Sequence, residues 1–232
     1  LKERTAVVRF KIVGEDAYFL AWTTTPWTLC SNIALCVNPD ETYARVKAAD
    51  GFTYIMAKAL LDKVLGGIER EEGTPAYEII EEYKGKDLEY KEYEPLYQCA
   101  KDCADKQHKK AFFVYCDNYV TMEDGTGIVH IAPNFGADDA LVAKKAGVPA
   151  IVLIGKKGEQ RPVVDLEGKY YLVEDLDDEF VKNYVNVEAW SRYSGRYVKN
   201  AYDENLTDKD ETLDVTICMD LKVENKAFKI EK

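Results

Sequence analysis

The sequence has no apolar run of the roughly 18 residues that a membrane-spanning helix needs. It also lacks an excess of positive charge, because 31 Lys and Arg residues stand against 42 Asp and Glu residues, for a formal net charge of -11. A protein that binds nucleic acid mainly through the phosphates should be basic on at least one face. Any contact of this chain with nucleic acid is therefore expected to be local, and no membrane partner is expected.

Further absences restrict the chemistry. The chain has only two histidines, and it contains no nucleophile elbow, no G-x-x-x-x-G-K-[ST] phosphate loop and no strand–G-x-G-x-x-G–helix unit. A Ser–His–Asp or Cys–His hydrolase needs a nucleophile at an elbow or helix start, and a hydrolytic metal needs more ligands than one histidine can anchor. We expect no cofactor in this domain.

The six cysteines, without a secretory signal, indicate reduced thiols and therefore a cytoplasmic protein. Four potential metal ligands follow one another as C-x3-C-x4-H-x7-C: Cys99, Cys103, His108 and Cys116. This spacing is looser than the C-x2-C pairs that zinc sites use, and Cys116 follows a strand-like apolar run. Unmatched thiols are favoured over a structural zinc, and no metal site is predicted.

Length and patterning predict a single domain, residues 1–232, with a β-rich α+β fold. A chain of 232 residues can bury a real core, and its apolar content of 47% is ordinary for a globular protein. The first residue is Leu1 rather than Met, which indicates a segment excised from a larger protein. Apolar and alternating runs predict strands, with a hairpin turn at Ala-Asp-Gly51. The expected strands are 5–13, 17–23, 32–37, 43–47, 52–56, one or two strands within 78–94, and 128–132 and 150–154 as central strands. The expected helices are 57–65, 138–146, 176–184 and 207–223, and residues 97–123 are expected to be an insertion or loop.

Two polar motifs stand out from this pattern. In the first, Thr23, Thr24 and Thr25 follow a predicted strand that Pro26 ends, since proline has no N–H to continue the ladder. In the second, Gly125-Thr-Gly-Ile-Val-His130, the glycines would let backbone N–H groups approach a ligand closely. Asp139 follows nine residues later, in the first turn of a predicted helix. Hydroxyls, amides, an imidazole and a carboxylate suit a pocket that recognises an ammonium group and orients water.

Each of these residues also has an ordinary structural explanation. β-Branched threonines favour strands, and a lone histidine on an apolar strand is commonly a core residue. Asp138 and Asp139 are favoured at a helix start by the helix dipole. The residue types alone therefore leave the function open.

The two motifs together resemble the editing domain, or connective peptide 1, of isoleucyl-tRNA synthetases. The matching residues are Trp-Thr-Thr-Thr-Pro-Trp-Thr-Leu-x-Ser-Asn over 22–32 and Gly-Thr-Gly-Ile-Val-His-x-Ala-Pro-x-Phe-Gly-x-Asp-Asp over 125–139. The valyl and leucyl enzymes typically have Thr-Thr-Arg-Pro, and they lack the Trp-Thr-Leu that follows here. The resemblance covers essentially the whole chain, more loosely at 66–120 and beyond 165. It implies a small closed β-barrel core with peripheral helices.

The resemblance also implies an activity. It is that of an aminoacyl-tRNA ester hydrolase that removes valine from mischarged valyl-tRNA(Ile), after transfer to the tRNA and, as a second option, before transfer. Isoleucyl-tRNA synthetases are a known case for such a second site, because one methylene is worth only about 1–3 kcal/mol of discrimination. The HIGH and KMSKS signatures of ATP-dependent aminoacylation are absent, so this fragment is not expected to charge tRNA. Its implied partners are the 3′ end of tRNA(Ile) and the rest of the synthetase in cis, within a monomer.

The resemblance assigns roles to single residues. Asp139 is expected to bind the α-ammonium group and to act catalytically with Thr23, Thr24 and Thr25, which contact the substrate and position water. His130 is expected to bound the side-chain pocket and exclude isoleucine. The other residues expected to bind substrate are Trp22, Trp27, Asn32, Gly125, Thr126 and Gly127.

One departure and three alternatives remain at this stage. Cys30 stands where the family usually has proline, which affects the loop between Trp27 and Asn32 but removes no proposed catalytic group. The chain could instead edit for a valyl or leucyl synthetase. It could be a hydrolytically silent module that binds the tRNA 3′ end, or a small zinc-stabilised binding protein.

Overall fold

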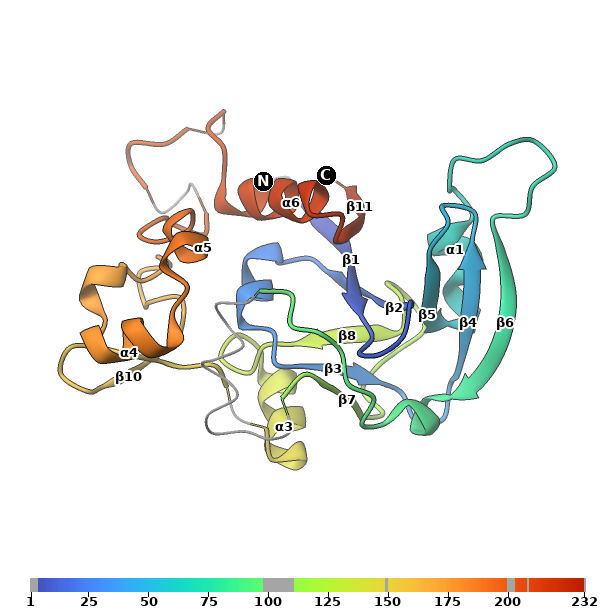
Figure 1. Cartoon of the computed structure of the whole chain (residues 1–232), viewed down its shortest axis with the longest axis horizontal. Helices are drawn as coiled ribbons and strands as arrows, with labels where there is room; N and C mark the ends of the chain where they lie inside the picture. Colours follow the sequence, from blue (N-terminus) through green and yellow to red (C-terminus); the bar gives the residue numbers. More distant parts are fainter. Residues whose placement is uncertain (1–3, 98–110, 149, 200–202, 208, 232) are drawn as a thin grey trace.

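The computed structural model describes residues 4–97, 111–148, 150–199, 203–207 and 209–231 (Figure 1). Most of the strands form one large sheet, and short helices lie around it. The strands are β1 (Thr5–Lys11), β2 (Tyr18–Thr23), β3 (Ala34–Val37), β4 (Thr42–Ala48), β5 (Thr53–Ala57), β6 (Tyr77–Lys84), β7 (Phe113–Cys116), β8 (Ile128–Ile131), β9 (Leu153–Ile154), β10 (Gln160–Arg161) and β11 (Ala227–Glu231). The α-helices are α1 (Leu61–Leu65), α3 (Ala137–Ala146), α4 (Asp178–Tyr184), α5 (Val187–Ser191) and α6 (Leu213–Val223), and the 3-10 helices are η1 (Pro26–Ser31), η2 (Lys58–Leu60), η3 (Gly85–Leu88) and η4 (Val173–Asp175).

The main sheet has the strand order β6-β4-β5-β2-β8-β3-β7, and β1 pairs with both β2 and β11. The strand β2 divides between two neighbours along its length. Its first half pairs in parallel with β5 at Tyr18 and Phe19, and its far end pairs in parallel with β8, where Trp22 meets Val129. The end of β2 therefore lies beside β8, which brings the two polar motifs together.

The sheet curls into a small barrel that closes through residues 90–94. Val114 of β7 donates its N–H to the Lys91 carbonyl, and Glu94 donates to the carbonyl of Lys11 at the end of β1. Isolated bridges join the same segment to both edges of the sheet. The predicted β-rich α+β fold with a small barrel core and peripheral helices is thus confirmed.

The barrel is filled by side chains from nearly every strand. Most residues of β1, β2, β3 and β5 are buried, as expected for strands covered on both faces. Large members of this core are Phe10, Phe19, Leu20, Leu35 and Ile55. The hairpin of β4 and β5, with β6 on its outer edge, extends the sheet beyond the barrel (Figure 1).

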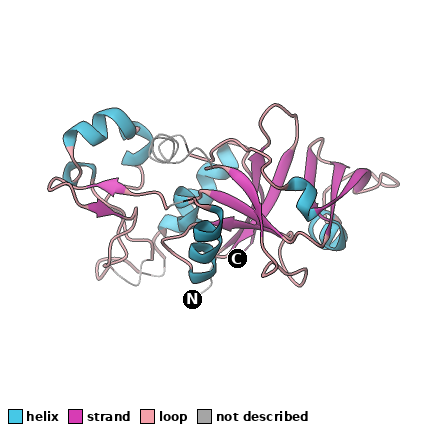
Figure 2. Ribbon diagram, turned by 90° about the horizontal axis from the view of Figure 1, so that it is seen from below, coloured by secondary structure: helices cyan, strands magenta, loops and turns pink. Residues whose placement is uncertain are grey.

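Residues 150–198 form a lobe beside the barrel, with α4, α5 and the two-stranded sheet of β9 and β10 (Figure 2). The expectation of a central strand at 150–154 is therefore wrong. Only Leu153 and Ile154 form a strand, and they pair with β10 rather than with the main sheet. The apolar neighbours of this strand are buried, as the sequence predicted, but they are buried within the lobe and not in the main sheet.

Other boundaries also shift. Of the one or two strands expected within 78–94, the structure has β6, which ends at Lys84 before η3 begins. The helix expected at 207–223 begins at Leu213. The expected loop at 97–123 contains strand β7, and the structure does not describe residues 98–110 within it. Among the described residues, no helix is long and apolar enough to cross a membrane.

Candidate functional site

A cavity of about 240 Å³ opens where β2 ends beside β8. The turn after β2, the strand β8 and the start of α3 supply its walls. Its lining residues are Trp22, Thr23, Thr24, Thr25, Thr28, Val129, His130, Ala132, Phe135 and Asp139. The cavity therefore joins residues that are about a hundred positions apart in the sequence.

The threonines reach the cavity because the chain turns from a strand into a 3-10 helix. Thr23 is the last residue of β2, and its hydroxyl oxygen accepts the N–H of Thr25 at 3.1 Å. Pro26 then opens η1, where a missing N–H costs nothing. The N–H of Thr28 donates to the Thr25 carbonyl at 2.9 Å, which completes the first turn. Thr28 thus faces the same cavity as the three preceding threonines.

A hydrogen bond from Asn32 holds His130 in one tautomer. The Nδ2 of Asn32 donates to the Ala34 carbonyl at 3.0 Å and to Nδ1 of His130 at 3.2 Å. The buried Tyr93 hydroxyl donates to Oδ1 of Asn32 at 2.6 Å, which fixes the orientation of that amide. Since Nδ1 accepts a hydrogen bond, the hydrogen of the neutral ring lies on Nε2.

The Nε2 hydrogen of His130 points toward the threonines. The Nε2 atom lies 2.8 Å from the hydroxyl oxygen of Thr28 and donates to it. The Thr28 hydroxyl in turn donates to the Thr25 carbonyl at 2.8 Å. The hydroxyl of Thr25 lies 3.3 Å from that of Thr28 and can donate to it. A directed chain of hydrogen bonds therefore runs from the core of the barrel to the cavity wall.

Burial lowers the pKa of His130 to about 4. The ring is only 7% exposed, and desolvation disfavours its charged form. His130 is consequently neutral at neutral pH, so it shapes the cavity and donates one hydrogen bond without adding charge.

Asp139 lines the same cavity from the first turn of α3. Its Oδ2 accepts the N–H of Ala132 at 2.9 Å, which fixes the carboxyl group between the end of β8 and the helix. Burial raises the pKa of Asp139, and the neighbouring charge of Asp138 adds to the effect. No Lys or Arg is among the ten residues that line the cavity. The ionised carboxylate therefore gives the cavity a negative charge that a bound cation would neutralise.

Six of the residues predicted from the sequence line this cavity: Trp22, Thr23, Thr24, Thr25, His130 and Asp139. Asn32 does not, because it lies behind His130 and acts on the ring. Trp27 also lies outside the lining, and its ring packs edge-on against Phe135 with the centroids 5.0 Å apart.

The Gly125-Thr126-Gly127 segment supports the cavity from outside rather than lining it. Thr126 is buried, and its hydroxyl donates to the Leu20 carbonyl at 2.6 Å. A Cβ on Gly125 would lie 3.1 Å from the Trp22 ring. The glycine thus lets the backbone pack against a tryptophan that does face the cavity.

Thr28, Val129, Ala132 and Phe135 line the cavity, although the sequence did not single them out. All four lie inside the two motifs, and Thr28 follows Thr25 by one turn of a 3-10 helix. That spacing is a usable signal, whereas the inward direction of Val129 and Ala132 depends on the pairing of β8.

No group of three or more His, Cys, Asp and Glu side chains suited to a metal ion occurs in the described parts of the chain. Cys99, Cys103 and His108 lie outside the described residues, so their arrangement with Cys116 is not tested. Cys116 itself belongs to β7, and its thiol donates to the Gly85 carbonyl at 3.7 Å.

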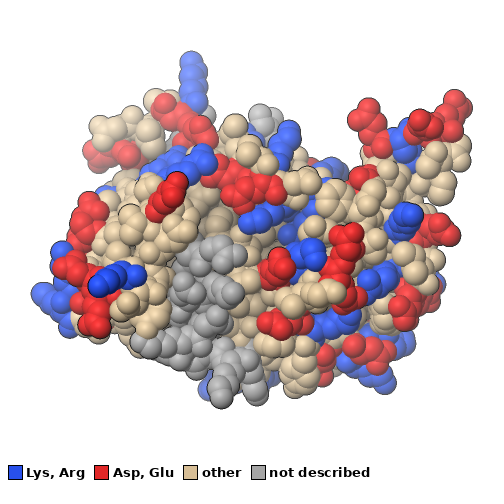
Figure 3. Space-filling view, viewed as in Figure 1, with Lys and Arg blue, Asp and Glu red and all other residues tan. Residues whose placement is uncertain are grey.

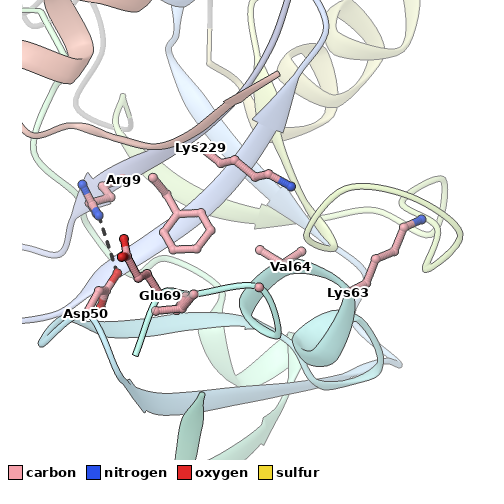
Figure 4. A pocket seen from close by; sticks show the side chains of 9 residues that line it. Arg9, Asp50, Lys63, Val64, Glu69 and Lys229 are labelled. Carbon is pink, nitrogen blue, oxygen red and sulfur yellow. Dashed lines mark ion pairs between the residues drawn. The ribbon is translucent and has the colours of Figure 1, made fainter. Parts of the chain in front are cut away.

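A second cavity, of about 330 Å³, lies between β1, α1 and β11 (Figure 4). The buried Arg9 reaches its edge and forms an ion pair with Asp50 at 3.6 Å. The Nε atom of Arg9 donates to the Tyr54 hydroxyl at 2.9 Å, and Nη1 donates to the carbonyl of Ala227 at 3.0 Å. These contacts attach β11 to the barrel and occupy the guanidinium group.

Comparison with known proteins gives a consistent result. No family model matches the chain. Over the whole chain it is 48% identical to an isoleucine–tRNA ligase of Bacteroides fragilis and 45% identical to one of Porphyromonas gingivalis. A ligase of the same name from Clostridium tetani is 45% identical over 68% of the chain. The chain spans 22% of the length of the first two relatives.

Solved structures show the same fold. The structure of GlLeuRS-CP1 matches with a TM-score of 0.61 at 13% identity, over 99% of both chains. The editing domain of the cytosolic leucyl-tRNA synthetase of P. falciparum matches with a TM-score of 0.55 at 11% identity, over 100% of both chains. At such low identity the likeness shows the fold alone.

Proposed function

Since the chain belongs to the isoleucyl-tRNA synthetase family, as its editing domain, we propose that it hydrolyses the ester bond of valyl-tRNA(Ile). The observation that carries this proposal is that Thr23, Thr24, Thr25, His130 and Asp139 line one cavity together. The reaction needs a site for the α-ammonium group, a positioned water and a limit on side-chain size. Each requirement has a candidate among the residues of this cavity.

Asp139 is the proposed site for the α-ammonium group. Its Oδ2 accepts the Ala132 N–H, and its side chain belongs to the cavity lining. A partly buried carboxylate without a cation is costly, and an ammonium group would offset that cost. The charge-assisted hydrogen bond formed in this way is worth about 1.5–3 kcal/mol.

The threonine hydroxyls are proposed to hold the attacking water. The hydroxyl oxygen of Thr23 accepts the Thr25 N–H, so its proton can donate toward the cavity. An aminoacyl ester is already activated, and the vicinal ribose hydroxyl can assist its hydrolysis. Placing a water correctly therefore supplies much of the required rate enhancement, without a covalent nucleophile.

His130 and its neighbours are proposed to set the size limit. The neutral ring is fixed on both nitrogens, so it cannot move aside easily for a larger side chain. One methylene is worth only about 1–3 kcal/mol when a pocket merely favours the larger ligand. A rigid wall that excludes isoleucine acts in the opposite direction and spares correctly charged tRNA.

The rest of the synthetase is proposed to deliver the tRNA 3′ end to this cavity in the cytoplasm. Acidic and basic side chains are interspersed over the face drawn in Figure 3. The net charge of -11 also argues against broad phosphate binding by this segment. The body of the tRNA is therefore assigned to other parts of the full-length protein.

The ammonium role is tested by comparing valyl-tRNA(Ile) with N-acetylvalyl-tRNA(Ile) as substrates of the full-length protein. The wild type should hydrolyse the first much faster, since acetylation removes the charge. The Asp139→Asn variant should hydrolyse both slowly and at similar rates. Fast hydrolysis of both substrates by the wild type would contradict the role of Asp139. No hydrolysis of either would favour a silent module that binds the tRNA end.

A further inference from the structure

The backbone of Trp27 is held at its N–H and at its carbonyl by residues from the C-terminal half of the chain. The N–H of Trp27 donates to Oδ1 of Asp214 at 2.9 Å, and the Tyr170 hydroxyl donates to the Trp27 carbonyl. The two partners lie 187 and 143 positions away in the sequence. Such distant contacts on the two peptide groups that flank one Cα atom restrict the position of Trp27 strongly.

Both partners are themselves fixed. Tyr170 is fully buried and stacks on Trp190, with the ring centroids 5.4 Å apart and the planes at 12°. Burial and the neighbouring Cys30 thiol raise the pKa of Tyr170, so its hydroxyl remains a donor. Asp214 lies in the first turn of α6, two residues after the N-cap Thr212.

Trp27 lies in sequence between Thr25 and Thr28, the two threonines at the end of the hydrogen-bond chain that starts in the barrel core. Thr25 is the N-cap of η1, and Thr28 is the next residue after Trp27. The ring of Trp27 supports Phe135, which lines the cavity. A displacement of the Trp27 backbone would therefore move Thr25, Thr28 and one wall of the cavity together.

We propose that Tyr170 and Asp214 are positioning residues for the hydrolytic site, acting through the backbone of Trp27. Neither lines the cavity, and each acts by holding η1 so that the hydroxyls of Thr25 and Thr28 keep their places. The lobe of residues 150–198 and α6 are thereby part of the machinery that orients water. This inference rests on the proposed hydrolysis of valyl-tRNA(Ile).

Tyr193 provides a matched control for Tyr170. It belongs to the same aromatic cluster, 6.2 Å from the Tyr170 ring, and its hydroxyl donates to Oδ2 of Asp220 at 2.7 Å. Both Tyr170→Phe and Tyr193→Phe remove one buried hydroxyl together with the hydrogen bond that it donates. The two variants should lose similar stability, whereas only Tyr170→Phe releases the Trp27 carbonyl.

The test measures deacylation of valyl-tRNA(Ile) by the full-length protein and its variants. In Tyr170→Phe, kcat should fall by about 10- to 100-fold, the loss typical of a small misplacement of catalytic groups, while KM stays within about twofold. Tyr193→Phe should remain near the wild type. Asp214→Ala should resemble Tyr170→Phe, and Asp214→Asn should recover activity because its amide oxygen still accepts the Trp27 N–H.

A second measurement does not depend on activity. Hydrogen–deuterium exchange of a peptide covering residues 25–32 should be faster in Tyr170→Phe than in Tyr193→Phe. Equal kcat and equal exchange in the two variants would overturn the positioning role. If the wild type hydrolyses no aminoacyl-tRNA, the proposed function is wrong, and the exchange data alone decide whether Tyr170 holds η1.

Discussion

The Nε2 atom of His130 lies 2.8 Å from the hydroxyl oxygen of Thr28, and the bond is directed from the histidine to the threonine. The direction follows from Asn32, which donates to Nδ1 and leaves the ring hydrogen on Nε2. A residue expected to bound the side-chain pocket is therefore also connected to the threonine turn. The connection makes the geometry of the turn depend on the barrel core.

Removal of the Thr28 hydroxyl should weaken both the fold and the reaction. In Thr28→Val the buried N–H of His130 loses its acceptor, which should cost about 1–3 kcal/mol in the free energy of unfolding. Thr28→Ser keeps the hydroxyl and should lose less than half as much. Urea unfolding and single-turnover deacylation of both variants measure the effect. Equal behaviour of the valine and serine variants would show that the hydrogen bond is unimportant.

The buried His130 should make stability depend on pH between 6.5 and 4. Its pKa is about 4 in the folded protein and about 6.5 when the chain is unfolded. The unfolded state therefore binds more protons in this interval, so the free energy of unfolding falls as the pH is lowered, by about 3 kcal/mol in total. The difference between the wild type and His130→Gln, followed by urea unfolding from pH 7 to pH 4, isolates this contribution. Parallel pH profiles for the two proteins would contradict it.

Asp139→Asn should separate activity from stability. Burial raises the pKa of Asp139, so the folded protein favours the protonated carboxyl group, and the stability it contributes is lost as the pH rises through the folded pKa. The asparagine can still accept the Ala132 N–H, and at pH 7 the variant should be at least as stable as the wild type. Deacylation should fall by about 10- to 150-fold, equivalent to about 1.5–3 kcal/mol. A variant that is active, or that is clearly less stable at pH 7, would argue against this account of the carboxylate.

Gly127 should tolerate substitution worse than a glycine in open space. Its φ is 73°, and a Cβ there would lie 2.4 Å from the Cβ of Ala57. Gly14, with a φ of 75° and no atom within 4 Å of a built Cβ, is the matched control. Gly14→Ala should cost about 1–2 kcal/mol for the left-handed backbone, and Gly127→Ala should cost about 1–3 kcal/mol more for the steric clash. Thermal and urea unfolding of the two variants compare the costs, and similar values would refute the close packing at Gly127.

The sequence predicted the barrel strands and six of the ten residues that line the cavity. Alternation and turn residues predicted β1, β2, β3 and the hairpin of β4 and β5, because those signals depend on local chemistry. The division of β2 between β5 and β8 depends on long-range pairing and leaves no mark on the sequence of β2. Closure through residues 90–94 escaped prediction for the same reason.

The supporting residues were the harder part of the site. Gly125 and Gly127 were expected to approach a ligand, whereas they approach Trp22 and Ala57. A glycine pattern shows only that something comes close to the backbone, and it does not show whether that is a ligand or another part of the chain. Nothing in the sequence indicated a role for Tyr170 and Asp214, since their contacts with the Trp27 backbone join segments far apart in the sequence.

The most direct test of the proposed function compares the hydrolysis of valyl-tRNA(Ile) and isoleucyl-tRNA(Ile) by the full-length protein under identical conditions. A cavity bounded by a fixed, neutral His130 and charged by Asp139 predicts rapid loss of valine, while isoleucine stays on the tRNA. Equal loss of both amino acids would contradict the size limit. The absence of any valine release would contradict the hydrolytic function itself.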